Sequence, residues 1–286
     1  MSSIAFPHLG IYLDHVIRTI PVFSFEIALY GITMAIAILA GLLMASWVAK
    51  KTGQNPDDYT NIALLGIVLG LIGARTYYVL FSWGYYSRHP GEILDLRGGG
   101  LALYGSLIGA IAAVLIYCAR RHLRIRLVLD TACLGMVTGQ IIGRWGNFFN
   151  REAFGEYTDS LFAMRLPLPD VRADEVTQLM HEHEQVIDGI TYIQVHPTFL
   201  YESLWNLGVL LILLAVTLKG IKKFDGEIFL GYLLLYGTGR FWIEALRTDQ
   251  LLIPGTQIAV SQVLSAVLAV TAAVLILVIR MKKKDN

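Results

Sequence analysis

Long apolar runs, each of about the length that crosses a membrane as a helix, dominate the pattern along the chain. A membrane-spanning helix needs about 20 mostly apolar residues, and seven runs reach that length. The pattern therefore predicts an all-α polytopic membrane protein with about seven transmembrane helices. The expected spans are Phe25–Val48, Asn61–Trp83, Leu101–Ala119, Leu127–Phe149, Phe199–Leu218, Ile228–Leu246 and Val260–Ile279.

The polar connections between these runs predict the orientation. Basic residues follow the first, third, fifth and seventh runs, whereas the segment 150–195 holds three arginines against nine acidic residues. Because Lys and Arg collect in cytoplasmic loops, we expect an extracytoplasmic N-terminus and a cytoplasmic C-terminus. Residues 1–286 then form a single membrane-embedded domain, with 150–195 as an extracytoplasmic insertion.

The insertion 150–195 has the composition of a small α/β-like cap. We expect a strand at Ser160–Leu166 and a helix at Ala173–Gln185. His181 and His183 lie in this segment, but no third metal ligand stands at a suitable spacing.

Composition supports the membrane assignment and excludes other classes. The 286 residues are 55% hydrophobic and 16% charged, and the mean hydropathy is +0.58; soluble domains carry about 25% charged residues. A net charge of +1 gives no reason to expect a nucleic-acid partner. The two cysteines, Cys118 and Cys133, cannot form a disulfide framework, and we expect them to be packing residues.

Several polar side chains interrupt the apolar runs at one expected depth. With a rise of about 1.5 Å per residue, Arg144 lies roughly 27 Å from the cytoplasmic face, Arg75 roughly 22 Å and Arg240 roughly 20 Å. Tyr30 and Tyr104 stand near the outer ends of their runs. Ionisable groups inside spans usually face the bundle interior and serve function. These residues therefore predict a polar site in the outer half of the bilayer.

Arginine at the depth of the lipid head groups is suited to binding phosphate, because its planar guanidinium donates to two oxygens at once. With few acidic residues expected nearby, the arginines predict a site for an anionic lipid phosphate. Tyr236, Arg240 and Glu244 are spaced four residues apart and share one helix face. The alternative is that each arginine snorkels or joins a structural ion pair.

The segment Gly143–Gly155 carries the most specific motif. It resembles the signature G-R-x-G-N-F-x-N-x-E-x-x-G of the prolipoprotein diacylglyceryl transferases, and Arg144, Asn147, Asn150, Glu152 and Gly155 all match it. Further segments resemble motifs of the same family. They are Leu29–Gly31, Gly73–Val79, Gly98–Gly105, His196–Glu202 and Gly239–Glu244, followed by Arg247.

The resemblance implies a membrane enzyme of the bacterial plasma membrane with no metal or organic cofactor. Members of the family transfer the diacylglyceryl group of phosphatidylglycerol to the lipobox cysteine of a preprolipoprotein, forming a thioether and releasing glycerol phosphate. Arg144 and Arg240 would then bind the phosphate and stabilise its developing charge. The resemblance further implies that the remaining site residues orient these arginines or bind the substrate. They are Tyr30, Arg75, Asn147, Asn150, Glu152, Gly155, Glu202, Tyr236 and Glu244.

Tyr104 departs from the family pattern, which often has histidine at this position as the candidate general base. The pKa of tyrosine is about 10 against about 8.5 for cysteine, so neutral Tyr104 is a poor base for a thiol. We therefore favour a scheme in which the thiolate forms in the positive field of the arginines while Tyr104 donates a hydrogen bond to the substrate. His196 is an alternative base.

Two other classes of function compete with the transferase. A phospholipid transporter or scramblase would also use a charged head-group site at the outer leaflet, and a structural or receptor-like protein would need no site. Transporters usually have related halves or polar paths through the whole membrane. Here the polar residues stay in the outer half, which favours chemistry at one face.

Overall fold

The computed structural model describes residues 3–23, 25–95, 99–256 and 258–284, so Gly98 of the expected third-span motif lies outside the described residues. The chain divides into two compact units. The first holds Met1–Gly41 with Cys133–Asn286, and the second holds Leu42–Ala132. Two long helices, α1 (Leu29–Lys51) and α5 (Ile125–Asn150), each have one end in either unit.

Each of the seven expected spans contains a helix, which confirms the polytopic helical class. Besides α1 and α5 they form α2 (Pro56–Phe81), α4 (Leu103–Arg121), α7 (Thr198–Leu218), α8 (Glu227–Glu244) and α9 (Val260–Lys284). Within the described residues, six of these helices are long and apolar enough to cross a membrane. The exception is α8, which carries Glu227, Arg240 and Glu244, so a seventh crossing stays a prediction.

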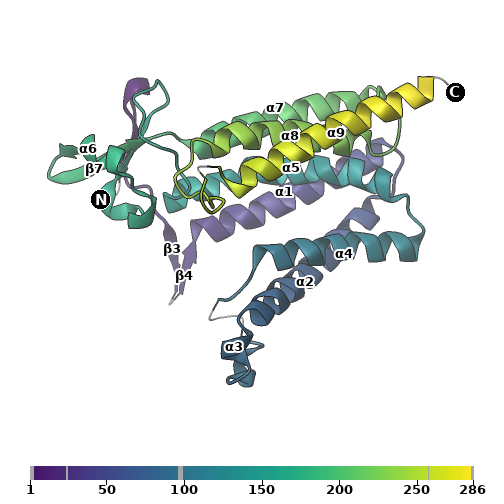
Figure 1. Ribbon diagram of the computed structural model, residues 1–286, viewed down its shortest axis with the longest axis horizontal. Coiled ribbons are helices and arrows are strands. Elements are labelled where there is room, and N and C mark those ends of the chain that lie inside the picture. Colours follow the sequence, from purple (N-terminus) through teal and green to yellow (C-terminus); the bar gives the residue numbers. More distant parts are fainter. Residues whose placement is uncertain (1–2, 24, 96–98, 257, 285–286) are drawn as a thin grey trace. The chain divides into compact units, whose positions relative to one another are not determined.

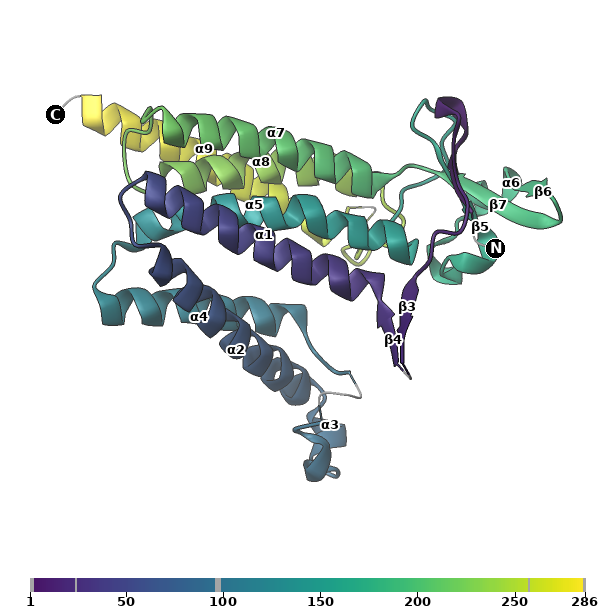
Figure 2. The ribbon, with the colours of Figure 1, turned by 180° about the vertical axis from the view of Figure 1, so that it is seen from behind.

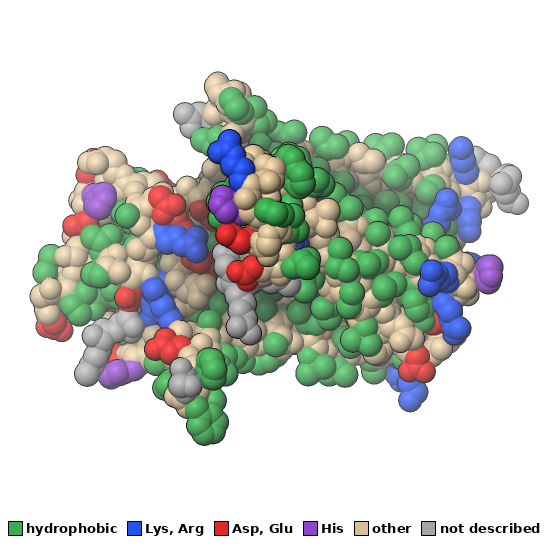
Figure 3. Space-filling model, turned by 90° about the horizontal axis from the view of Figure 1, so that it is seen from below, with side chains coloured by type: hydrophobic (Ala, Val, Ile, Leu, Met, Phe, Trp, Pro, Cys, Tyr) green, Lys and Arg blue, Asp and Glu red, His purple; other side chains and the backbone are tan. Residues whose placement is uncertain are grey.

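The surface of the long helices is apolar. Large hydrophobic side chains such as Leu39 of α1, Leu211 of α7 and Val270 of α9 are more than half exposed. Figure 3 shows many hydrophobic side chains on the face that it draws. Helices satisfy their own backbone hydrogen bonds, so an apolar helix surface is stable in lipid.

In the first unit, glycines bring the start of α1 against α5. A Cβ at Gly41 would lie 2.7 Å from the carbonyl oxygen of Gly135, and one at Gly139 would lie 3.2 Å from that of Ala37. These glycines therefore allow close helix packing, because a side chain there would force the helices apart. Helix α8 packs against both α7 and α9, and the three helices lie side by side in Figures 1 and 2.

A five-stranded antiparallel sheet forms the cap of the first unit, with the strand order β2-β1-β5-β7-β6. Its strands are β1 (Ile4–Phe6), β2 (Ile11–Leu13), β5 (Met164–Pro167), β6 (Gln185–Ile187) and β7 (Ile190–Val195). The cap is thus larger than the expected insertion, because two N-terminal strands join it. Its core includes Leu166, Ile193, Phe148 of α5 and Phe199 of α7, so the sheet is anchored to the helix ends that carry the site.

Short elements replace two expected ones. The expected cap helix at Ala173–Gln185 is a 3-10 turn, η4 (Ala173–Glu175), followed by the short helix α6 (Gln178–Glu182), while another turn, η3 (Leu168–Asp170), follows β5. The first expected span starts too early, because Phe25–Ala28 is strand β4 and pairs with β3 (Thr19–Val22) in a hairpin. Near the N-terminus, η1 (Pro7–Leu9) separates β1 from β2.

In the second unit, α2 and α4 pack closely through small residues. A Cβ at Gly73 would lie 2.3 Å from the carbonyl oxygen of Gly105, and one at Gly109 would lie 2.1 Å from that of Leu69. Helix α2 begins where the side chain of Asn55 accepts a hydrogen bond from the Asp57 amide, with Pro56 at its first position. After α2 come α3 (Trp83–Tyr86) and η2 (Pro90–Glu92).

Candidate active site

The signature segment turns sharply where α5 ends. Arg151 and Ala153 have φ angles of 54° and 57°, the left-handed region that ends a helix. This turn brings the Glu152 carboxylate back to the helix, where Asn147 and Asn150 donate to its Oε1 at 3.2 and 3.3 Å. Arg172 of the cap donates to its Oε2 at 2.9 Å. The amides of the motif therefore hold Glu152, and Glu152 connects the cap to α5.

One carboxylate on α7 collects three arginines. Glu202 is buried, with 4% of its side chain exposed, and its Oε2 lies 2.7 Å from Nη2 of Arg144. Its Oε1 accepts from Nη1 of Arg240 at 2.9 Å and from Nη1 of Arg247 at 3.4 Å. Arg144 of α5 and Arg240 of α8 therefore converge on the same point, as the expected depths require.

Further acids complete this group on the side of α8. Arg240 forms an ion pair with Glu244 one turn along the same helix, and Ser261 of α9 donates to Oε1 of Glu244 at 2.5 Å. Arg247 binds both oxygens of Asp249, at 2.8 and 2.6 Å. We call these six charged residues the arginine–carboxylate cluster: Arg144, Glu202, Arg240, Glu244, Arg247 and Asp249.

The arginine–carboxylate cluster differs from the expected site in its charge. Three arginines face three carboxylates, so the expectation of few nearby acids is wrong. The acids come from α7, from the end of α8 and from the loop after it, far from Arg144 in sequence. Arg144 is the least enclosed arginine, with 22% of its side chain exposed against 17% for Arg240 and 10% for Arg247. The sequence did not indicate Asp249, which lies in the α8–α9 connection, or Ser261, which lies in the first turn of α9.

Three other expected site residues lie close to the cluster. A Cβ at Gly146 would lie 2.9 Å from Cδ2 of Tyr30, so the ring of Tyr30 packs on α5 two residues beyond Arg144. Tyr236 lies one turn before Arg240 and stacks on Tyr232 with 5.4 Å between ring centroids. Gly155 forms an antiparallel bridge with Arg247, and a Cβ there would lie 2.7 Å from the carbonyl oxygen of Leu246. The glycine therefore allows the signature segment to pack against the chain that carries Arg247.

Arg75 and Tyr104 belong to the second unit. The Arg75 guanidinium donates to the carbonyl oxygens of Glu92, Ile93, Gly99 and Gly100 at 2.6 to 3.1 Å, and it lies over the ring of Tyr86. Tyr104 is 58% exposed, and its ring centroid is 6.3 Å from that of Tyr77. Arg75 is thus occupied by the backbone of its own unit, whereas the Tyr104 hydroxyl is accessible.

Burial and charge shift the pKa of several groups outside the spanning helices. Burial lowers the pKa of His196, whose Nδ1 lies 3.2 Å from the Tyr201 hydroxyl, so the imidazole is neutral near pH 7. Burial raises the pKa of Glu175, which accepts from the Ala153 amide at 2.8 Å. Burial alone would lower the pKa of Arg247, but the bonds and charge of Asp249 outweigh it and raise that pKa.

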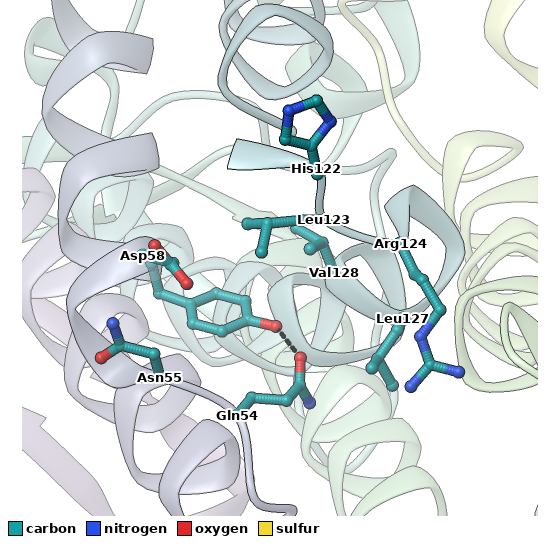
Figure 4. A pocket seen from close by; sticks show the side chains of 9 residues that line it. Gln54, Asn55, Asp58, His122, Leu123, Arg124, Leu127 and Val128 are labelled. Carbon is teal, nitrogen blue, oxygen red and sulfur yellow. Dashed lines mark hydrogen bonds between the residues drawn. The ribbon is translucent and has the colours of Figure 1, made fainter. Parts of the chain in front are cut away.

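A separate cavity of about 210 Å³ lies in the second unit, between the α1–α2 and α4–α5 connections. Asp58 and Arg124 are among its lining side chains, and the Tyr59 hydroxyl donates to Gln54 at its edge (Figure 4). None of the expected site residues lines this cavity.

Apolar helices around a cluster of ionised side chains are typical of a membrane protein with a functional site inside its helix bundle. Comparison with known proteins identifies the family. The sequence profile of the prolipoprotein diacylglyceryl transferases matches residues 17–278, and the chain belongs to this family. It is therefore a multi-pass protein of a bacterial membrane and a transferase that acts in the first step of lipoprotein maturation.

Curated relatives agree over nearly the whole chain. A phosphatidylglycerol–prolipoprotein diacylglyceryl transferase from Clostridioides difficile is 38% identical over 96% of this chain and 98% of its own length. Proteins with the same name from Bacillus velezensis and Lactobacillus acidophilus are 41% and 42% identical, each over 88% of this chain and over 88% and 85% of their own lengths. The comparisons give no support to a lipid transporter.

Proposed function

We propose that this chain transfers the diacylglyceryl group of phosphatidylglycerol to the lipobox cysteine thiol of preprolipoproteins at the arginine–carboxylate cluster. The convergence of Arg144 and Arg240 on Glu202 carries the proposal. The sulfur of the thiolate attacks the glyceryl carbon that bears the phosphate, and the bond between that carbon and the phosphate oxygen breaks. The bond electrons leave with the phosphate, so the products are a thioether and glycerol phosphate.

The arginines favour this step because the phosphate gains charge during it. The diester carries one negative charge, and the departing monoester carries up to two near pH 7. Guanidinium groups fixed before the reaction stabilise the added charge more than they stabilise bound substrate. Glu202 holds Arg144 and Arg240 in place. Glu244 forms a further ion pair with Arg240, and Asp249 forms one with Arg247.

The acids of the cluster change the expected route of the thiol proton. Because three carboxylates offset three arginines, the positive field available to form a thiolate is weaker than the sequence suggested. A neutral His196, with its lowered pKa, is then the favoured proton acceptor. Tyr104 contributes a hydrogen bond to substrate, and Arg75 shapes the segment between α3 and α4 that leads to Tyr104.

The proposed orientation places the cap outside the cytoplasm and the C-terminus inside. It is supported by basic last turns in α1, α4 and α9, at Lys50–Lys51, Arg120–Arg121 and Lys282–Lys284. The cluster lies at the opposite ends of α5 and α8 from the cytoplasmic side that this rule assigns. Lipid substrate would therefore enter from the outer leaflet of the bilayer.

Purified protein in mixed micelles with phosphatidylglycerol and a lipobox peptide tests the proposal directly. The peptide mass should rise by one diacylglyceryl unit, and glycerol phosphate should appear in equal amount. A peptide with serine in place of the lipobox cysteine is the matched control and should keep its mass. An unchanged mass of the cysteine peptide would refute the proposed reaction.

A further inference from the structure

A second polar layer lies one helical turn deeper than the arginine–carboxylate cluster. Gln140 precedes Arg144 by four residues on α5, Asn206 follows Glu202 by four on α7, and Tyr236 precedes Arg240 by four on α8. Helix α7 runs opposite to the other two, so all three steps lead in the same direction. Four residues correspond to about 6 Å along a helix.

Hydrogen bonds between the helices define the register of this layer. Ser203 of α7 donates to the carbonyl oxygen of Ile141 on α5 at 2.9 Å, which puts Asn206 within about one helical turn of Gln140 along the antiparallel pair. Trp205 of α7 donates to the carbonyl oxygen of Leu235 on α8 at 2.9 Å, which puts Asn206 within about one helical turn of Tyr236. Gln140 in turn donates to the Tyr232 hydroxyl at 2.8 Å.

Two polar atoms of this layer are buried without a partner among the described residues. Gln140 uses its Nε2 on Tyr232, but its Oε1 accepts no hydrogen bond. Asn206 is 2% exposed, and its Nδ2 donates to no acceptor. Buried polar groups in proteins nearly always have partners. An unused acceptor and an unused donor at one level therefore indicate a ligand group that both donates and accepts.

We propose that Gln140 and Asn206 bind a hydroxyl of the head group of the lipid whose phosphate lies between Arg144 and Arg240. A hydroxyl donates to Gln140 Oε1 and accepts from Asn206 Nδ2. An ammonium head group only donates and an ester carbonyl only accepts, so each would leave one amide unsatisfied. The pair thus selects a polyol head group over ethanolamine. This inference rests on the proposed function and adds the residues that set its lipid specificity.

The test compares two lipids with identical acyl chains, phosphatidylglycerol and phosphatidylpropanol, which lacks the head-group hydroxyls. In Asn206→Leu the ratio of the two kcat/KM values should fall roughly tenfold, the effect of one lost hydrogen bond. The kcat/KM for phosphatidylglycerol should fall, while the kcat/KM for phosphatidylpropanol should stay at the parent value. Gln140→Leu should lower the ratio too, although it also loses the bond to Tyr232.

Thr217→Val is the matched control, because Thr217 lies near the other end of α7 and donates to the carbonyl oxygen of Leu213. It should leave the ratio unchanged. An unchanged ratio in Asn206→Leu would overturn the inference and assign the pair to a bound water. An equal loss with both lipids would overturn it as well, since it indicates a structural role. Failure of the proposed function is distinguishable, because the parent protein would then modify the lipobox peptide with neither lipid.

Discussion

Arginines that are buried or half-buried occur in both units, but different groups compensate their charges. In the first unit Arg144, Arg240 and Arg247 share the carboxylate of Glu202. In the second unit Arg75, which is 7% exposed, donates to four backbone carbonyls. A phosphate has the charge and geometry to replace or join a carboxylate on a guanidinium. Carbonyls belong to the chain itself, so an arginine that binds them is fixed in place by the fold.

The comparison separates arginines whose carboxylate partners a phosphate can replace from an arginine whose carbonyl partners are fixed by the fold. Gly100 shows how tightly the second is built, because a Cβ there would lie 2.6 Å from Nη1 of Arg75 and its φ angle is +72°. At the cluster, by contrast, 22% of the Arg144 side chain is exposed. Mutations at the two places should therefore affect different quantities, catalysis in one unit and stability in the other.

The largest expected effect is the loss of catalytic activity in Arg144→Ala. Removing one preorganised donor to developing charge costs about 10²- to 10³-fold in kcat, and we expect a loss of this size in the peptide lipidation assay. The thermal midpoint should change little, since Arg144 contributes one bond to Glu202. Arg120→Ala, an exposed arginine at the end of α4, is the matched control and should keep full activity. Full activity of Arg144→Ala would remove the cluster from the mechanism.

The second largest expected effect is a loss of stability in Arg75→Met. The substitution leaves four carbonyls without their charged donor, and we expect unfolding to become easier by about 2–4 kcal/mol. Thermal unfolding in detergent measures the change, with the exposed Arg88→Met as control. Activity should fall only in proportion to the folded fraction. A variant with the parent's thermal midpoint but a raised KM for phosphatidylglycerol would instead show that Arg75 binds substrate.

Much of this comparison could not be predicted from the sequence, for physical reasons. The seven helices follow from long apolar runs, which are local patterns. The cap strands β1 and β5 are three and four residues long and meet across about 160 positions, so no local pattern predicts their pairing. The convergence on Glu202 depends on the rotation of three helices about their axes. The helical rise predicted similar depths for Arg144 and Arg240, and the resemblance named Glu202 and Glu244, but no motif indicated Asp249 as the third acid.

A smaller effect is expected on the pH dependence of stability, through Asp249 at the edge of the arginine–carboxylate cluster. Asp249 binds Arg247, and this partner holds the pKa of Asp249 below its usual 3.8 against the opposing effect of burial. A carboxyl with a lowered folded pKa stabilises the protein above its unfolded pKa, and this contribution is lost as pH falls through the folded pKa.

Asp249→Asn should therefore lower the thermal midpoint by about 2–4 °C at pH 7, the shift expected for an ion pair worth about 1 kcal/mol. The difference from the parent should stay constant down to about pH 5 and shrink below about pH 3.8. The deficit of Arg75→Met should not change with pH over this range, because carbonyls do not titrate. A pH-independent deficit in Asp249→Asn would show that its pairing with Arg247 does not stabilise the fold.

The smallest expected effect concerns Tyr104, which stands where the family often has histidine. Its hydroxyl has no hydrogen-bond partner among the described residues, and its side chain is largely exposed. The hydroxyl is therefore free to donate the hydrogen bond to substrate that the proposed function assigns to it. Losing one such bond in Tyr104→Phe should lower kcat/KM by roughly threefold to fivefold. Tyr104→His, which supplies a base with a pKa of about 6.5, should restore or exceed parent activity near pH 7. The control Tyr12→Phe, on the exposed strand β2, should have no effect, and full activity of Tyr104→Phe would exclude Tyr104 from catalysis.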